Sequence, residues 1–451
     1  MRRGHVRELA HLRISSMLFR CAVLCACIGL GITISIIPAI PIWEGSAFVF
    51  LAIGITVWAV LGATHPLAWM CTLYSIYFLV GVQNWVQPSS ALGFRGYVSA
   101  EPTLRLADIG LLAFAAGTLL TVGFRRRTTM HGRFSEMVSA DRAGRLLLAI
   151  GAIGLCATVA KLGIPILNIG IRSKASHGTW ALLSYAIIPG GLLATMNYRS
   201  VRHDLAVILG CDLALVLLAY RSPVILFTGC FLLLRLLQGR IRQRTVILAG
   251  LALAVFAIGL FTYRLEAAGK TLVNQNVVPR GPFQEVPSLF PFYIGFSREG
   301  VAVLARLQEM VPSYRPYFHG TVQASMFKSL FHSTSPRQYV YDVAYGTEVA
   351  QTTLTPTIIG GPYLDFGTAG VIAEMLAVGM ISGSLYRCVL RRRTNQWLVL
   401  SLSYWTTLAI MGIHTGLLDA TSLFIMPGMA AGAIAVVHLT RGRVVERERA
   451  V

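Results

Sequence analysis

One polar interval, residues 263–361, concentrates side chains that could do chemistry in an otherwise apolar chain. Its titratable residues include Arg264, Arg280, Arg298, Arg306, Arg337, His319, His332, Glu299, Asp342 and Glu348. Guanidinium groups are always charged and bind phosphate oxygens through a two-pronged fork. Imidazole and carboxylate groups transfer protons. The chemistry that this stretch could carry is therefore binding of a phosphorylated ligand combined with general acid–base catalysis.

Six basic residues are the candidate ligands of a diphosphate group. They are Arg172, Lys174, Arg221, Arg264, Arg298 and Arg337. Arg221 stands in a tight Arg-Ser-Pro connection between two apolar runs, where an arginine is costly unless it faces a cavity or an anionic partner. A lipid diphosphate would meet that demand, because its charged head lies at this depth while its tail stays in the bilayer. The alternatives are that Arg221 snorkels to the interface and that the loop arginines pair with lipid headgroups.

His319 and Asp365 are the candidate catalytic residues for proton transfer. His319 lies in Tyr317-Phe-His-Gly320, and Asp365 follows Gly360-Gly361-Pro362 where the chain returns to apolar sequence. A hydrogen-bonded structural histidine at a helix start and a capping aspartate are the alternatives. Three further histidines are candidates for the same role: His177, His332 and His414. His414 lies near the outer end of a span, where it could instead face helix partners. Tyr314 and Tyr317 are candidates for stacking on sugars or for lining the membrane interface.

Composition places these residues in a membrane protein. Of the 451 residues, 55% are hydrophobic and only 13% are charged. Apolar runs of about 17 to 22 residues are long enough to cross a hydrocarbon core as helices, and the alternating strands of an outer-membrane barrel are not found. The prediction is an all-α polytopic membrane protein with about 12 transmembrane helices and one large external loop. The predicted spans are 18–37, 47–63, 67–83, 107–124, 145–161, 179–196, 204–220, 222–237, 245–263, 363–386, 397–414 and 418–438.

Arginine clusters between the apolar runs predict the orientation. The formal net charge of +20 comes largely from such clusters, for example Arg125–Arg127 and Arg391–Arg393. This is a positive-inside signal, for which anionic membrane lipids and not nucleic acid are the natural partners. Both termini are therefore predicted to be cytoplasmic. The predicted organisation is an N-terminal transmembrane bundle (1–262), a large external loop (263–362) and C-terminal transmembrane helices with a basic tail (363–451).

No cofactor and no metal site is predicted. The eight cysteines lie almost all within apolar runs, where they are expected to pack between helices, and a dense cluster of histidines and acids is not visible. A divalent ion that bridges a diphosphate to Asp365, Asp342 or Glu348 stays open. Asp212 and Glu374, the acids deep in apolar runs, are functional candidates by default but are expected to pair between helices.

Two short amphipathic helices are predicted inside the external loop. Apolar residues recur at helical spacing from Ser297 to Met310, before Val311-Pro312 ends the pattern, and again from Gly320 to Phe331. The second helix is expected to lie along the outer membrane surface.

This layout of many spans, a late external loop and a closing set of spans is similar to the Wzy-type O-antigen polymerases, also called oligosaccharide repeat unit polymerases. Three segments carry the resemblance: Leu217-Leu-Ala-Tyr-Arg-Ser-Pro-Val224, Val311-Pro-Ser-Tyr-Arg-Pro-Tyr-Phe-His-Gly320 and Thr355-Pro-Thr-Ile-Ile-Gly-Gly-Pro-Tyr-Leu-Asp-Phe-Gly-Thr-Ala-Gly370. The match covers the second half of the chain, and the first half agrees in layout. Pro336-Arg337 stands where the family often has Pro-Arg after the second loop helix.

The resemblance implies a GT-C-like membrane glycosyltransferase at the outer face of a bacterial inner membrane. Such an enzyme transfers a growing glycan from undecaprenyl diphosphate to the sugar of an incoming lipid-linked repeat unit. Arginines, first of all Arg172, Arg221 and Arg298, would hold the leaving diphosphate, and His319 or Asp365 would accept the proton of the attacking hydroxyl. The partners are lipid-linked oligosaccharide donor and acceptor, and a chain-length regulator protein is a further candidate.

Two other functions compete with this reading of the sequence. An O-antigen ligase-type enzyme uses the same donor and differs only in its acceptor. A lipid-linked oligosaccharide flippase or transporter should show internal repeats and polar groups at mid-membrane in paired broken helices. The sequence shows no clear repeat, and its polar residues concentrate in one outer loop, which favours an enzyme.

Overall fold

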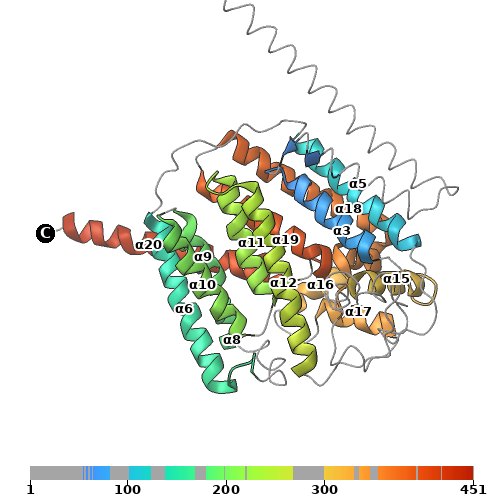
Figure 1. The fold of residues 1–451 in the computed structure, drawn as a ribbon, viewed down its shortest axis with the longest axis horizontal. Helices are drawn as coiled ribbons and strands as arrows, with labels where there is room; N and C mark the ends of the chain where they lie inside the picture. The colour runs from blue at the N-terminus through green and yellow to red at the C-terminus, as the bar shows by residue number, and fades with distance from the viewer. Residues whose placement is uncertain are drawn as a thin grey trace, which may run out of the picture.

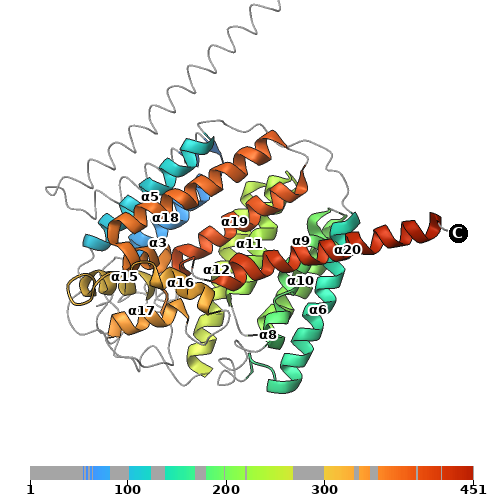
Figure 2. The same ribbon diagram turned by 180° about the vertical axis from the view of Figure 1, so that it is seen from behind.

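The structure is a computed structural model of the whole chain. It describes residues 54, 57–58, 61–62, 64–81, 101–122, 138–167, 179–197, 199–218, 221–267, 299–329, 335–345, 354–392, 395–417 and 419–449. Every regular element within these residues is a helix. Figure 1 and Figure 2 show the helices gathered in one bundle, from which the end of α20 extends. The predicted all-α class is confirmed for the described part of the chain.

The helices follow the chain in the order expected of a polytopic membrane protein, interrupted once by a group of short helices. Their bounds are α3 (Pro66–Gly81), α5 (Glu101–Val122), α6 (Val138–Leu162), α8 (Thr179–Ser184), α9 (Ile187–Met196), α10 (Val201–Leu217), α11 (Arg221–Leu237), α12 (Gln243–Ala267), α15 (Glu299–Met310), α16 (Thr321–Lys328), α17 (Pro336–Tyr345), α18 (Thr357–Arg391), α19 (Gln396–Thr415), the π-helix η5 (Thr421–Ile425) and α20 (Met426–Arg449).

Seven helical segments among the described residues are long and apolar enough to cross a membrane. They correspond to predicted spans, with ends that differ by a few residues, and α3, α10 and α11 match three more predicted spans as shorter helices. The predicted span 18–37 and most of 47–63 lie outside the described residues. The chain is a multi-pass membrane protein, and the count of twelve stays a prediction.

Small residues let α5 and α18 pack with their backbones almost touching. The two helices lie side by side in both views (Figure 1, Figure 2). A Cβ atom on Gly117 would lie 2.2 Å from the carbonyl oxygen of Leu376, and a Cβ atom on Gly379 would lie 2.2 Å from that of Phe114. Close approach at glycines is a common way for helices to associate in lipid, where the hydrophobic effect gives no driving force.

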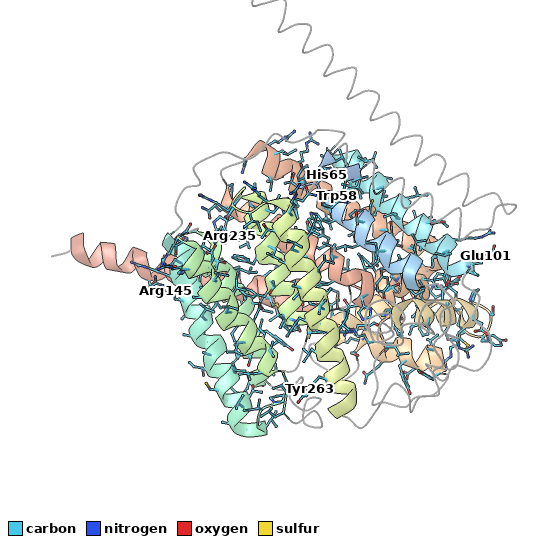
Figure 3. The ribbon with its side chains drawn as sticks, in the orientation of Figure 1. Trp58, His65, Glu101, Arg145, Arg235 and Tyr263 are labelled. Atoms are coloured by element: carbon cyan, nitrogen blue, oxygen red, sulfur yellow. The ribbon has the colours of Figure 1, made fainter. Side chains whose placement is uncertain are left out.

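Two polar contacts mark opposite ends of the bundle. Arg235, only 1% exposed, donates to the Asp204 carboxylate at 2.7 Å and to the backbone carbonyl of Thr195 at 2.6 Å. Tyr263 donates to the carbonyl of Ile166 at 3.0 Å. Figure 3 shows Arg235 and Tyr263 at opposite ends of the pair α11 and α12. A buried guanidinium requires such a carboxylate partner.

The short helices α15, α16 and α17 pack together on α3, α5 and α18. Figure 2 shows them at one end of these long helices, and a single apolar core runs through all of them, with Leu304, Val322, Val340 and Ile358 among its fully buried members. The predicted loop helices at Ser297–Met310 and Gly320–Phe331 are confirmed as α15 and α16, whereas α17 was not predicted. The polar interval is therefore built into the bundle through these helices.

The α5–α18 contact gives the first testable prediction. A valine in place of Gly379 cannot fit against a backbone carbonyl, and overpacking of this kind typically costs about 1–3 kcal/mol. We expect Gly379→Val to lower the thermal denaturation midpoint of the detergent-solubilised protein. Gly250→Val in α12 is the matched control, because a Cβ atom there meets nothing within 4 Å. Equal midpoints for the two variants would contradict the packing described here.

Candidate functional site

Arg221, His414 and Tyr77 form a hydrogen-bonded chain of side chains from three helices. The Nη2 atom of Arg221 lies 3.4 Å from Nε2 of His414, and Nδ1 of His414 lies 2.8 Å from the hydroxyl oxygen of Tyr77. Arg221 begins α11, His414 is in the last turn of α19, and Tyr77 is near the end of α3. These three hydrogen-bonded side chains therefore lie where the ends of three helices meet on the same side of the bundle. We call them the Arg–His–Tyr chain.

The arginine determines how the histidine is protonated within this chain. A guanidinium carries donors and no acceptor, so Nε2 of His414 must present its lone pair to Arg221. In a neutral imidazole the proton is then on Nδ1, which donates it to the Tyr77 oxygen. His414 is thus held in one tautomer, with its basic nitrogen turned toward the Arg221 guanidinium.

A second arginine reaches the same site from the external loop. Arg337 lies in the first turn of α17, behind a proline at the first helical position, which is a favourable place for proline. It is close enough to His414 to interact with it electrostatically, as Arg221 does. Arg337 also lines a small pocket together with Ser222, Thr415 and Asp419. Two of the six predicted diphosphate ligands, Arg221 and Arg337, are therefore brought together.

Asp419 shapes the far side of this pocket. Its Oδ1 atom accepts a hydrogen bond from the backbone N–H of Thr421 at 3.0 Å, and its Oδ2 atom accepts one from the Ser422 hydroxyl at 2.7 Å. These bonds hold the start of η5. π-Helical turns are rare in proteins, and those that occur are often found at functional sites.

Asp365 caps a loop helix with both of its oxygens. Oδ1 accepts the N–H of Val322 at 3.0 Å, and Oδ2 accepts the N–H of Gln323 at 2.9 Å. The side chain is fully buried, and its backbone carbonyl accepts the N–H of His319. The carboxylate satisfies the first-turn donors of α16, whose own N-cap position is Gly320 and has no side chain to offer. This geometry favours a positioning role over that of a general base.

The helix α18 is broken directly after Asp365. Phe366 and Gly367 leave helical geometry, and Gly367 has a φ of +63°, which glycine adopts without strain. The ring of Tyr317 lies against this break, since a Cβ atom on Gly367 would be 2.7 Å from its hydroxyl oxygen. About two turns beyond the break, Gln323 of α16 donates to the Glu374 carboxylate at 2.5 Å. Glu374 thus pairs between helices, as expected.

The other predicted site residues lie apart from the Arg–His–Tyr chain or outside the described residues. His319 is exposed on the turn before α16, beside the ring of Phe366, and Tyr314 is 73% exposed. Arg172, Lys174, Arg298, His177 and His332 lie outside the described residues. Arg264 falls within α12, but its side chain is not among those described. No group of three or more metal-ligating side chains occurs in the described part of the chain.

Sequence reasoning named His414 only as a secondary candidate and did not name Tyr77 at all. Tyr77 lies in the apolar run Tyr74-Ser-Ile-Tyr-Phe, where a tyrosine is expected to pack. The available signal for His414 was its position at the outer end of a span, level with Arg221. Arg221 and His414 both lie at the ends of predicted spans on the same side. This shared position was the signal that could have placed the two residues in one site.

Together, the fold and the site define a polytopic helical membrane protein with a basic, histidine-containing site at one end of its bundle. The chain belongs to the O-antigen polymerase family: a family model described as "Putative O-antigen polymerase" matches residues 38–426. Comparisons with curated proteins and with solved structures find no match. Membership of this family identifies a membrane polymerase that joins oligosaccharide repeats into polysaccharide, and it confirms the resemblance drawn from the sequence.

The capping role of Asp365 makes a graded prediction. Asp365→Asn keeps one acceptor for the α16 donors and Asp365→Ala keeps none, so stability should fall in that order, with a loss of about 0.5–2 kcal/mol for alanine. We expect polymerising activity to follow the same order, together with faster proteolysis near residues 311–329. A complete loss of activity in Asp365→Asn, with unchanged stability and proteolysis, would instead place this carboxylate in the chemical step.

Proposed function

We propose that this protein is a glycosyltransferase that polymerises undecaprenyl-diphosphate-linked oligosaccharide repeat units at the outer face of the bacterial inner membrane. The observation that carries the proposal is the convergence of Arg221 and Arg337 on His414 at one end of the bundle. Family membership supports the reaction class. The positive-inside signal supports cytoplasmic termini and an external position for the loop helices.

Arg221 and Arg337 bind the diphosphate of the donor lipid in this proposal. As the bond between the sugar and the diphosphate breaks, negative charge grows on the leaving oxygen, and fixed guanidinium groups stabilise that charge. Arg298, Arg172 and Lys174 from the outer loops and Arg264 near the end of α12 are the remaining proposed contributors. The lipid tail stays in the bilayer.

His414 is the proposed general base. When the donor binds, Arg221 turns its N–H donors toward phosphate, which frees the Nε2 lone pair of His414 for the proton of the attacking sugar hydroxyl. The Tyr77 hydroxyl accepts from Nδ1 and stabilises the imidazolium that forms. His319, our first choice from the sequence, is then a residue of the exposed turn that leads into α16. Tyr314 and Tyr317 remain candidates for sugar contacts.

Substitutions in the Arg–His–Tyr chain test this mechanism. We expect His414→Ala to lower the elongation rate by roughly 10²–10⁴-fold, the usual range for general acid–base catalysis, and Tyr77→Phe to lower it less. Arg221→Ala should abolish elongation while leaving membrane insertion intact. The measurement is turnover of a purified lipid-linked repeat unit in nanodiscs, with and without a chelator.

Arg105→Ala is the control for these variants. Arg105 is a partly exposed arginine of α5 that pairs with Glu101 four residues away, so its removal should change the rate by less than about twofold. Normal elongation by both Arg221→Ala and His414→Ala would refute the assigned roles.

Glycan analysis of cells that lack the protein separates the competing functions. A polymerase is needed only to extend repeat units, so its loss should leave single units on the cell surface. Loss of a ligase should leave almost none, because transfer to the acceptor itself fails, and loss of a flippase should trap lipid-linked units on the cytoplasmic face. We expect single units, and either other pattern would contradict polymerisation.

A further inference from the structure

The first turn of α18 lies near Tyr77 of the Arg–His–Tyr chain. Gly300, near the start of α15, links the two: a Cβ atom on it would lie 2.3 Å from the Tyr77 hydroxyl oxygen and 3.0 Å from Cγ2 of Thr357. Thr357 is the first residue of α18. Its neighbour Ile358 lies near α19, since a Cβ atom on Gly412, within one turn of His414, would be 3.4 Å from Cδ1 of Ile358. The start of α18 therefore borders the candidate site at Tyr77.

No side chain in the described part of the chain is seen to cap this helix start. The N-cap position is Pro356, which makes no side-chain hydrogen bond. The first N–H groups of an α-helix have no partner within the helix, and their aligned dipoles give the end a partial positive charge. A helix start of this kind attracts phosphate oxygens. By itself, a helix start is only a favourable position for an anion and does not identify a binding site.

A second, independent observation indicates a ligand at this helix start. Thr357 is 0% exposed, and its hydroxyl has no hydrogen-bond partner in the described part of the chain. The hydroxyl of Thr355, two residues earlier, is also buried without a partner there. Buried hydroxyl groups are otherwise nearly always hydrogen-bonded, because desolvation without a partner is unfavourable. Two such donors beside an uncapped helix start are suited to an oxyanion.

We propose that the first turn of α18, with the hydroxyls of Thr357 and Thr355, is a second oxyanion-binding element of this site. It binds one phosphate group of the diphosphate whose other phosphate is held by Arg221 and Arg337. The inference rests on the proposed function for the identity of the diphosphate. The hydroxyls donate to phosphate oxygens, and no covalent step is assigned to them.

Thr357→Val tests the inference with little change of shape. Valine is nearly isosteric with threonine and is also branched at Cβ, so the φ of +67° at this position costs both residues a similar amount. Removal of a buried hydroxyl that lacks a partner should leave the stability of the ligand-free protein equal or higher. Binding of inorganic pyrophosphate should nevertheless weaken by roughly tenfold, as expected for one lost hydrogen bond to a charged group.

The experiment measures the thermal midpoint of the full-length protein in phosphatidylcholine nanodiscs against pyrophosphate concentration. Thr357→Ser keeps the hydroxyl and should bind as the parent protein does, and Thr355→Val should weaken binding in the same direction as Thr357→Val. If Thr357→Val lowers the midpoint without ligand, the hydroxyl is structural and the inference fails. It also fails if phosphatidylglycerol nanodiscs give the Thr357-dependent stabilisation and pyrophosphate does not.

A parallel titration of Arg221→Ala separates this inference from the proposed function. Loss of pyrophosphate binding in Arg221→Ala, with parental affinity in Thr357→Val, would overturn the inference and leave the arginine assignment standing. Absence of pyrophosphate binding in the parent protein would overturn both. Weakened binding in both variants, with an undiminished midpoint in ligand-free Thr357→Val, is the expected result.

Discussion

The Asp365 carboxylate is the interaction on which the arrangement of the site depends. A helix that breaks within or near a membrane leaves backbone groups that must find partners inside the protein. At the break in α18, the Asp365 carboxylate accepts hydrogen bonds from two backbone N–H groups of α16. The backbone carbonyl of Asp365 accepts a third from the N–H of His319. The loop helices are thereby bonded to the membrane bundle, and α17 can present Arg337 to residues of α11 and α19. The polar interval forms a site because it is fixed at this point.

The spans were predictable because they depend on local sequence. Length and apolar content decide whether a helix crosses a membrane, so runs such as 397–414 located α19 to within a few residues. The amphipathic spacing of α15 and α16 was equally local. The break in α18 was not predicted. Pro362 and Gly367 were visible in the sequence, but what satisfies the backbone there comes from residues about forty positions earlier.

The chemical type of the site, arginines beside a histidine, was predictable from the sequence. The individual residues were predictable only in part. Arg221 was identified because an arginine between apolar runs is costly without a cavity or an anionic partner, and Arg337 because it is one of the arginines of the polar interval. The choice of His319 over His414 followed local polarity, since His319 lies in a polar stretch and His414 in an apolar helix. Tyr77, however, contacts His414 across 337 residues of sequence. Periodicity along one helix carries no information about such a contact. The height of a side chain along its helix and the direction in which it points, relative to a second helix, are determined only by how the two helices pack.

A broken helix also occurs in transporters, so the position of the site has to separate the two classes. Transporter sites lie near the bilayer midplane, between repeats that each contribute a broken helix. Here Arg221, His414 and Thr357 each lie at a helix end, and Tyr77 is near one. The remaining walls come from α15 and α17, which belong to one loop. A site at helix ends suits the proposed reaction, in which glycan must enter and leave from the aqueous side while both lipid carriers stay in the bilayer. Alternating access would require opposite ends of the bundle to open in turn, and Arg235, bonded to Asp204 and Thr195, ties α11 to α9 and α10 at the far end.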